Sequence, residues 1–204
     1  LSRRRMGRPR LHDDDHVLDA ARGLVLTSGV SAATTEAIAR ASGAPVGSLY
    51  HRFGSREQLL ATMWLRAVRR SHESFLRPIE AADPREAAVA AALSILDFCV
   101  EHFADAQLLV TLRQRDLLRE ASPETREMLT AVNEPVAVAM RRLASRLTQA
   151  RPSTRTMEIV TLALVDLPLG AVRRHLAAGQ LPPRSLRGPL EAAVRATLDA
   201  LARS

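Results

Sequence analysis

The stretch from Val46 to Arg52 carries the side chains best suited to contact another molecule. Its first three residues, Val, Gly and Ser, are small. At the start of a helix they would allow close approach to the edges of base pairs, where a serine hydroxyl can donate or accept a hydrogen bond. Tyr50, His51 and Arg52 follow, and such side chains can reach phosphates, which position a protein on DNA without reading its sequence. The stretch therefore favours contact with DNA.

Two short helices and a tight turn would hold this stretch in place. The pattern predicts helices over about 34–41 and 46–53, separated by Ser-Gly-Ala-Pro, and a longer helix over about 13–29 before them. Gly43 can take the left-handed conformation that ends a helix. Such a turn sets the third helix across the second, so that it can enter a major groove. Small helical bundles share this spacing, so the pattern alone leaves a plain bundle open.

A basic arm precedes these helices. Residues 1–10 hold five arginines and no acidic residue, within a chain of formal net charge +7. A solvated tail is one interpretation of such a run. However, the Gly-Arg-Pro-Arg of residues 7–10 resembles the core of an AT-hook, an extended segment whose arginine enters a narrow minor groove. With a DNA-reading helix behind the arm, we favour contact with the minor groove or with phosphates.

Composition narrows the class of protein. Hydrophobic residues make up 47% of the 204 residues and aromatic residues only 3%, which favours a folded and helical chain. Cys99 is the single cysteine, so an internal disulfide cannot form and a reducing compartment is expected. No stretch approaches the roughly 18 apolar residues that span a bilayer. We therefore expect a cytoplasmic protein without a membrane partner.

The sequence lacks the common catalytic and metal-binding motifs. It contains no GxSxG, no P-loop, no dinucleotide-binding glycine pattern and no HExxH. His12 and His16 are four residues apart, but the three Asp residues between them are better explained as caps of the predicted first helix. We expect no catalytic residue, no bound metal and no cofactor, and a protein that is not an enzyme.

The first helices also resemble a known family. Residues 34–60 read TTEAIARASGAPVGSLYHRFGSREQLL. They contain Thr-x-x-x-Ile-Ala, then Gly, then Gly-x-Leu-Tyr-His-x-Phe, then Ser-x-Glu-x-Leu-Leu at fixed spacing. Over about residues 13–60 the chain resembles the N-terminal domain of the TetR family of bacterial transcriptional regulators. The resemblance implies a homodimer, a palindromic operator in double-stranded DNA, and a small-molecule pocket in the C-terminal domain.

The chain departs from the family pattern at four positions. Pro45 stands where Ser is usual, and Val46 stands where Lys is frequent. Arg52 replaces a commonly aromatic residue, and Arg56 replaces a common Lys. The operator sequence therefore cannot be inferred from relatives.

The expected architecture is all-α, with nine helices in two domains. Residues 1–10 form the arm, residues 11–54 the helix-turn-helix domain, and residues 55–204 a bundle for ligand binding and dimerisation. The helices expected in the bundle cover about 55–77, 84–103, 105–119, 122–149, 153–178 and 186–202. The residues expected to contact DNA are Arg8, Arg10, Thr34, Thr35, Pro45, Val46, Gly47, Ser48, Tyr50, His51 and Arg56.

A second set of residues is expected to bind the effector. These are Trp64, Phe75, Phe98, His102, Phe103, Arg113, Met140 and Asp166. Plain core packing is an alternative for each of them. His102, Arg113 and Asp166 would be costly to bury without partners, so they are the best anchors, although an Arg113–Asp166 pair or surface exposure explains them equally. A pocket rich in Leu, Ala and Met would favour a small and largely apolar effector.

The last two predicted helices carry stripes of small and apolar residues. The stripes are Ile159, Leu162, Ala163, Asp166, Leu167, Gly170 and Ala171, then Leu190, Ala193, Val194, Thr197, Leu198 and Leu201. Intramolecular core is one explanation. The family resemblance implies a four-helix interface across a two-fold axis, and we favour a homodimer through these helices.

A repressor released from its operator by a small effector is the function that we favour. A DNA-binding protein of the same fold without an effector is the first alternative, and an all-α enzyme or scaffold is the second. In the favoured mechanism, the long helix from Ser55 begins beside the DNA, where Arg56 can hold a phosphate. Its far end, with Trp64 and Phe75, borders the pocket, so that a ligand would change the separation of the two recognition helices.

Deleting residues 1–10 should weaken binding to all DNA and flatten the dependence of affinity on salt. Each phosphate neutralised contributes roughly 0.9 to the slope of log K against log salt, and five arginines could neutralise up to about five. Fluorescence anisotropy of labelled duplex at several salt concentrations measures this slope for the full and shortened chains. An unchanged slope would show that the arm does not touch DNA.

Overall fold

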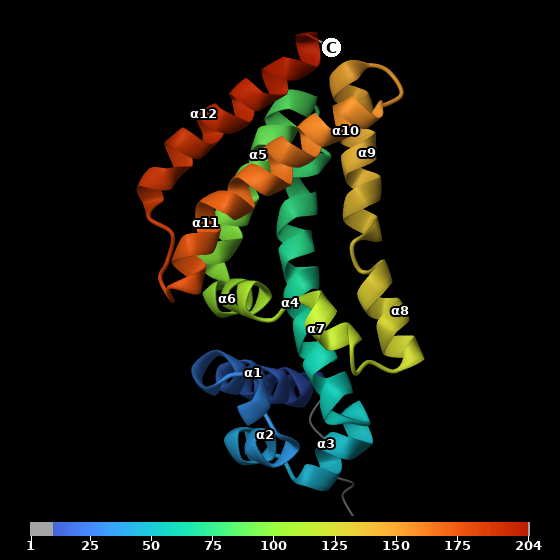
Figure 1. Ribbon diagram of the computed structural model, residues 1–204, viewed down its shortest axis with the longest axis vertical. Helices are drawn as coiled ribbons and strands as arrows, with labels where there is room; N and C mark the ends of the chain where they lie inside the picture. The colour runs from blue at the N-terminus through green and yellow to red at the C-terminus, as the bar shows by residue number, and fades with distance from the viewer. Residues whose placement is uncertain (1–9, 204) are drawn as a thin grey trace, which may run out of the picture.

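The computed structural model describes the backbone of residues 10–203 and the side chains of residues 14–201. The described part of the chain is helical and contains no strand, which confirms the predicted all-α class. Figure 1 shows a small three-helix unit at one end of a long helix, and a larger bundle around the remainder of that helix.

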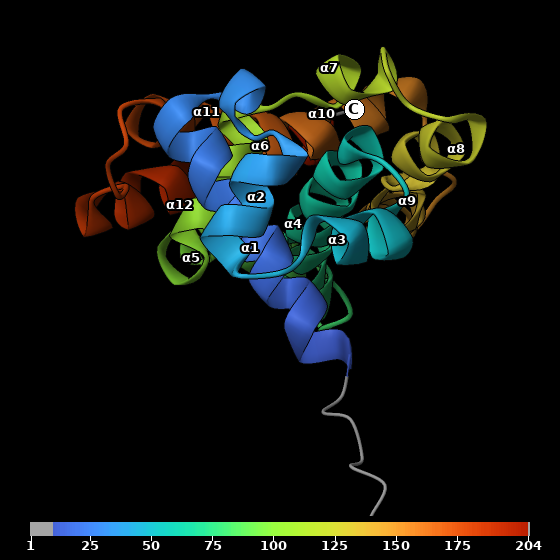
Figure 2. The same ribbon diagram turned by 90° about the horizontal axis from the view of Figure 1, so that it is seen from below.

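The small unit consists of α1 (Arg10–Ser28), α2 (Thr35–Ser42) and α3 (Val46–Phe53), with the short 3₁₀-helix η1 (Val30–Ala32) between the first two. Gly43 ends α2 with a left-handed φ of 69°, as the turn requires. Val17, Val25, Ile38 and Leu49 are buried in the core of this unit. Seen from below, α2 and α3 form its outer end (Figure 2).

The long helix α4 (Arg56–Ile79) joins the two parts of the molecule. The hydroxyl of Ser55 accepts a hydrogen bond from the Gln58 amide at 3.1 Å, which caps its first turn. The helix includes Pro78 in its last turn and ends at Ile79, two residues beyond its predicted end at about residue 77. Arg146 caps that end by donating to the carbonyl of Ile79 at 2.9 Å.

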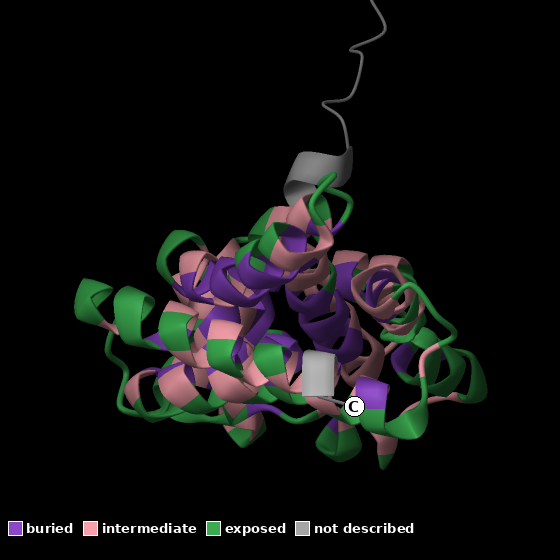
Figure 3. Ribbon diagram, turned by 90° about the horizontal axis from the view of Figure 1, so that it is seen from above, coloured by how far each residue is buried: buried purple, intermediate pink, exposed green. Residues whose placement is uncertain are grey.

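The larger bundle surrounds the upper part of α4. Its elements are α5 (Pro84–Glu101), α6 (Phe103–Thr111), α7 (Gln114–Leu118), α8 (Pro123–Ala131), α9 (Glu134–Thr148), α10 (Thr154–Thr161), α11 (Leu167–Ala177) and α12 (Arg187–Leu198). A π-helical turn, η2 (Leu162–Asp166), joins α10 to α11, and the 3₁₀-helices η3 (Arg184–Leu186) and η4 (Asp199–Arg203) flank α12. Seen from above, most of the buried residues lie toward the middle of the molecule and most of the exposed residues lie at its periphery (Figure 3).

Two of the nine predicted helices are interrupted. The helix predicted over 105–119 breaks at Leu112 and Arg113, whose backbones are extended, and so becomes α6 and α7. The helix predicted over 122–149 breaks between α8 and α9, just before Pro135. Proline has no amide hydrogen to donate to the carbonyl four residues earlier, which here belongs to Ala131, the last residue of α8, and its ring clashes with that carbonyl. Pro168 acts more mildly, because the π-helical turn before it keeps the run from α10 to α11 continuous.

The predicted stripes on the last two helices lie partly inside the monomer. Ala163, Leu190, Val194 and Leu198 are buried against α5 and α9 within this chain, and Leu198 is only 1% exposed. For these residues the intramolecular explanation is correct. On the continuous helical run from α10 to α11, the exposed residues include Leu162, Asp166, Leu169, Gly170 and Arg173.

Within the described residues, no single helix is long and apolar enough to cross a membrane. Only α5 and α6 together have the length and composition, and they are bent by 104° relative to each other.

Candidate functional sites

The outer face of α3 presents the residues predicted to read DNA. Gly47 and His51 are exposed, and Tyr50 is 50% exposed. Leu49 is buried and anchors the opposite face of the helix. Apart from Gly47, its two neighbours and the backbone of α3 itself, no described heavy atom lies within 4 Å of the point where a Cβ of Gly47 would stand. The helix therefore offers an open and narrow surface at its second residue, with room for another molecule to approach its backbone.

The residues around this face differ in what they expose. Thr34 is exposed, but its hydroxyl accepts a hydrogen bond from the Ala37 amide at 3.1 Å and caps α2. Thr35 is only 5% exposed, so any contact that it makes with DNA falls to its backbone amide. Pro45 is exposed, whereas Val46 and Ser48 are partly buried. Arg8 and the side chain of Arg10 lie outside the described residues.

Arg56 has a different environment from the one expected. Its Nε donates to the carbonyl of Ala33 at 2.8 Å and its Nη2 to the carbonyl of Val30 at 2.6 Å. The guanidinium therefore braces η1 from the first turn of α4 instead of pointing freely toward a phosphate. Arg52 also lies against the protein, because its Nε donates to Asp14 of α1 at 2.6 Å and its guanidinium lies over the Phe53 ring.

A cavity of about 850 Å³ opens inside the larger bundle, between α4, α5, α6, α9 and α11. Its wall is mostly apolar. The residues predicted for this role that line it are Trp64, Phe75, Phe98, Arg113, Met140 and Asp166. His102 and Phe103, which were also predicted for this role, do not line the cavity. They lie at the junction of α5 and α6, where the His102 ring packs against Phe98 with ring centroids 5.3 Å apart.

The polar groups of the cavity fall into two sets. Arg113, Asp166 and Arg173 are exposed at its rim, and no ion pair joins Arg113 to Asp166 among the described residues. The second set is uncharged and includes His72, which is partly buried, and Asn133, which is exposed. Burial lowers the pKa of His72 below its ordinary value, and a hydrogen bond with Asn133 raises it by less, so the imidazole is neutral at neutral pH.

Sequence reasoning missed His72, although a signal was present. Trp64, Val68, His72 and Phe75 are spaced by four, four and three residues, which places them on one face of a helix. The same wall includes Cys99, whose pKa is raised to about 12 by burial. A thiol with so high a pKa is not a nucleophile at neutral pH.

Comparisons with known proteins support the family resemblance. Residues 17–63 match the model of the bacterial regulatory proteins of the tetR family. No curated protein matches the sequence significantly. The solved structure of the TetR family transcriptional regulator PfmR from Thermus thermophilus is 23% identical, with a TM-score of 0.64 over 92% of this chain and 97% of that one.

Two further solved structures are similar along nearly the whole chain. The ketosteroid transcriptional regulator KstR2 of Mycobacterium tuberculosis is 17% identical, with a TM-score of 0.68 over 94% of this chain and 95% of that one. The fatty acid degradation regulator FadR from Bacillus halodurans is 17% identical, with a TM-score of 0.66 over 89% and 97%. At this level of identity the likeness establishes the fold.

Together, the three-helix unit with its exposed third helix, its match to the tetR family model and the helical domain behind it define a DNA-binding transcription regulator. Residues 17–63 thus form a DNA-binding unit of the tetR type, and the whole chain has the same fold as the similar solved structures of TetR regulators.

Replacing Gly47 with Ala should separate folding from DNA binding. Within a helix, Ala is more stable than Gly by roughly 0.5–1 kcal/mol, and the protein has room for the methyl group. The same methyl would stand between α3 and the base pairs, so we expect specific DNA affinity to fall by roughly tenfold or more, the size of a lost base contact.

Thermal unfolding and a DNA titration of Gly47→Ala measure the two effects. Gly23→Ala is the matched control, because Gly23 is also exposed and helical with open space around it. It should gain stability and keep its DNA affinity. Normal DNA binding by Gly47→Ala would mean that α3 does not approach DNA through its first turn.

Proposed function

We propose that this regulator is a repressor, released from a palindromic operator by a small and largely apolar effector. The observation that carries the proposal is the position of α4. Leu59 and Leu65 of this helix belong to the same core as α1–α3, whereas His72 and Phe75 of the same helix line the cavity. A ligand in the cavity therefore contacts the helix on which the DNA-binding unit is mounted.

Repression would require the two recognition helices of a dimer to match successive turns of the duplex, roughly 34–36 Å apart. A ligand that binds better to another placement of α4 would shift the population away from this spacing. The choice of repression over activation rests on the resemblance to the TetR family, whose members are commonly repressors. A regulator of the same fold without an effector is the alternative, and the size of the cavity argues against it.

The cavity favours an apolar effector with few polar groups. The partly buried His72, which is hydrogen-bonded to Asn133, suits an uncharged carbonyl or hydroxyl, and the charged groups Arg113, Asp166 and Arg173 are exposed. Two structural neighbours are a ketosteroid regulator and a fatty acid degradation regulator, and these names are in keeping with apolar effectors of this kind. Arg113 at the rim is a candidate partner for a carbonyl or an anionic group.

Selection of bound fragments from the host genome tests the DNA-binding half of the proposal. The expected result is a palindromic site, with affinity that falls steeply with salt. A bound sequence without two-fold symmetry would reject the palindromic operator.

The effector half is tested by following Trp64, the only tryptophan. Its indole lines the cavity, and its Nε1 donates to the carbonyl of Leu112 at 2.8 Å. A true effector should change its fluorescence and release operator DNA over the same range of concentration. Release with wholly unchanged emission would contradict transmission through α4.

We propose that the dimer forms through the exposed sides of the last two helical runs, which are α10 to α11 and α12. Leu162 is 44% exposed, and Leu169 and Gly170, which also border the cavity, are exposed further along α11. Small and apolar groups that face outward in this way suit close packing against a second copy.

Leu162→Glu should therefore weaken the dimer while leaving the monomer folded. An unpaired charge in an apolar interface costs about 3–5 kcal/mol, which corresponds to a loss in dimer affinity of more than a hundredfold. Sedimentation equilibrium measures the effect. Met128→Glu on α8, where the side chain is 46% exposed, is the control and should dimerise normally. A dimer of Leu162→Glu as tight as the parent would place the interface elsewhere.

A further inference from the structure

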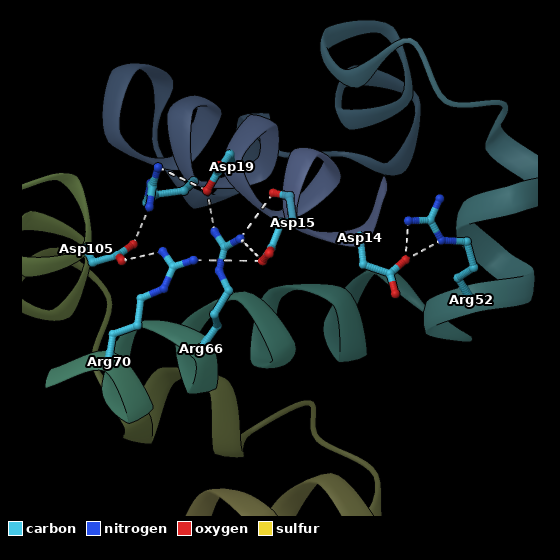
Figure 4. A network of polar contacts seen from close by, with 8 residues as sticks. Asp14, Asp15, Asp19, Arg52, Arg66, Arg70 and Asp105 are labelled. Atoms are coloured by element: carbon cyan, nitrogen blue, oxygen red, sulfur yellow. Dashed lines mark hydrogen bonds and ion pairs between the residues drawn. The ribbon is translucent and has the colours of Figure 1, made fainter. Parts of the chain in front are cut away.

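One carboxylate is buried where the three-helix unit meets the bundle. Asp105, in the first turn of α6, is only 2% exposed. Its Oδ1 accepts a hydrogen bond from Arg22 of α1, and its Oδ2 accepts one from Nη1 of Arg70 of α4 at 3.0 Å (Figure 4). Each oxygen therefore holds a different helix, and α6 is clamped to α1 and α4 at once.

Further ion pairs surround this carboxylate. Arg66 of α4 donates to Asp15 of α1 at 2.7 Å and also contacts Asp19, while Arg22 pairs with Asp19 at 3.0 Å. Together with Asp105, three carboxylates face three guanidiniums across the junction of α1, α4 and α6 (Figure 4). The three negative and three positive charges balance, and the ion pairs between them fix how α1, α4 and α6 lie relative to one another.

The same short helix forms a wall of the cavity. Ala106, Leu109 and Val110 of α6 line it, and Ala106 directly follows Asp105 in the sequence. At the other end of α6, the Leu112 carbonyl accepts the hydrogen bond from Trp64 of α4. The helix is thus fixed at both ends, and its displacement by a ligand would strain the contacts of Asp105.

We propose that Asp105 is a positioning residue for operator binding, which fixes α1 against α4 and α6 and thereby sets the placement of α3. The proposal rests on the proposed function, because α6 then connects the effector cavity to the DNA-binding unit by a route that includes α1 as well as α4. α3 follows α1 because Arg52 pairs with Asp14 and because both helices share one core.

The charge of Asp105 is what allows it to hold two arginines. Burial raises the pKa of Asp105, but the hydrogen bonds and charges of Arg22 and Arg70 outweigh burial and bring the pKa below its ordinary value. The group is therefore ionised at neutral pH. An asparagine has a single acceptor oxygen, and its amide nitrogen would face the second guanidinium, donor against donor.

The test compares Asp105→Asn with the parent on a full operator and on a half-site. A charge-assisted hydrogen bond is worth roughly a factor of ten or more in an equilibrium constant. We expect the full-site affinity to fall by about that factor, since fewer molecules hold both recognition helices in register. The half-site, which needs only one α3, should be bound within about twofold of the parent. A purely structural defect would weaken both.

Arg22→Gln is the second variant, because it leaves Asp105 paired with Arg70 and the fold less disturbed. It should show the same split, and the double variant should lose little more than either single variant. Glu86→Gln is the matched control, since Glu86 pairs with Arg195 of α12 at 2.7 Å, away from the junction. Equal effects on full site and half-site, or no effect on either, would overturn the proposal.

A distance measurement keeps this test separate from that of the proposed function. Spin labels at Thr27→Cys on α1 and Ala90→Cys on α5, in a Cys99→Ala background and diluted with unlabelled protein, report the placement of α1 by pulsed electron resonance. We expect a single narrow distance in the parent and a broader or shifted one in Asp105→Asn. An unchanged distribution would reject the positioning role even if no operator or effector were found.

Discussion

The structure depends on one constraint, the burial of α4 in two cores at once. Leu59 and Leu65 pack with the three-helix unit, and Phe75 and Ile79 pack with the bundle. Each large apolar side chain that is fully buried contributes about 1.5–3 kcal/mol. A helix anchored in this way at both ends behaves as a rigid rod, so a displacement of its upper half carries the DNA-binding unit with it.

Beside the apolar core that α1–α3 share with α6–α8, the contact between the two parts includes a polar junction. At the junction of α1, α4 and α6, arginines and aspartates face one another, and only Asp105 is fully buried. Partly exposed ion pairs contribute little net stability, because desolvation offsets their attraction. They do impose geometry, since each guanidinium has a fixed set of directions. Such a junction holds α1 in one placement but adds little to the stability of the fold. In the proposed mechanism, a ligand can therefore shift α1 to another placement without unfolding the protein.

The helix α3, which we propose reads DNA, shows how little local stability a contact surface needs. α3 has only eight residues, too few to be stable alone in water. Its stability comes from Leu49 and the packing of its inner face. The exposed residues of α3 therefore contribute little to its stability, which explains why a glycine can stand at the second position of the helix.

Local sequence determined the helices and the small unit, because caps, turns and apolar spacing act within a few residues. Thr34, Gly43 and Ser55 stand where a helix begins or ends, as predicted. The missed break before Pro135 was also local. Tertiary structure decided what depends on distant partners. Arg56 turns to backbone carbonyls, and Asp105 meets arginines 83 and 35 residues away. Apolar stripes are ambiguous for the same reason: spacing identifies a buried face, but only packing decides whether this chain or a second copy covers it.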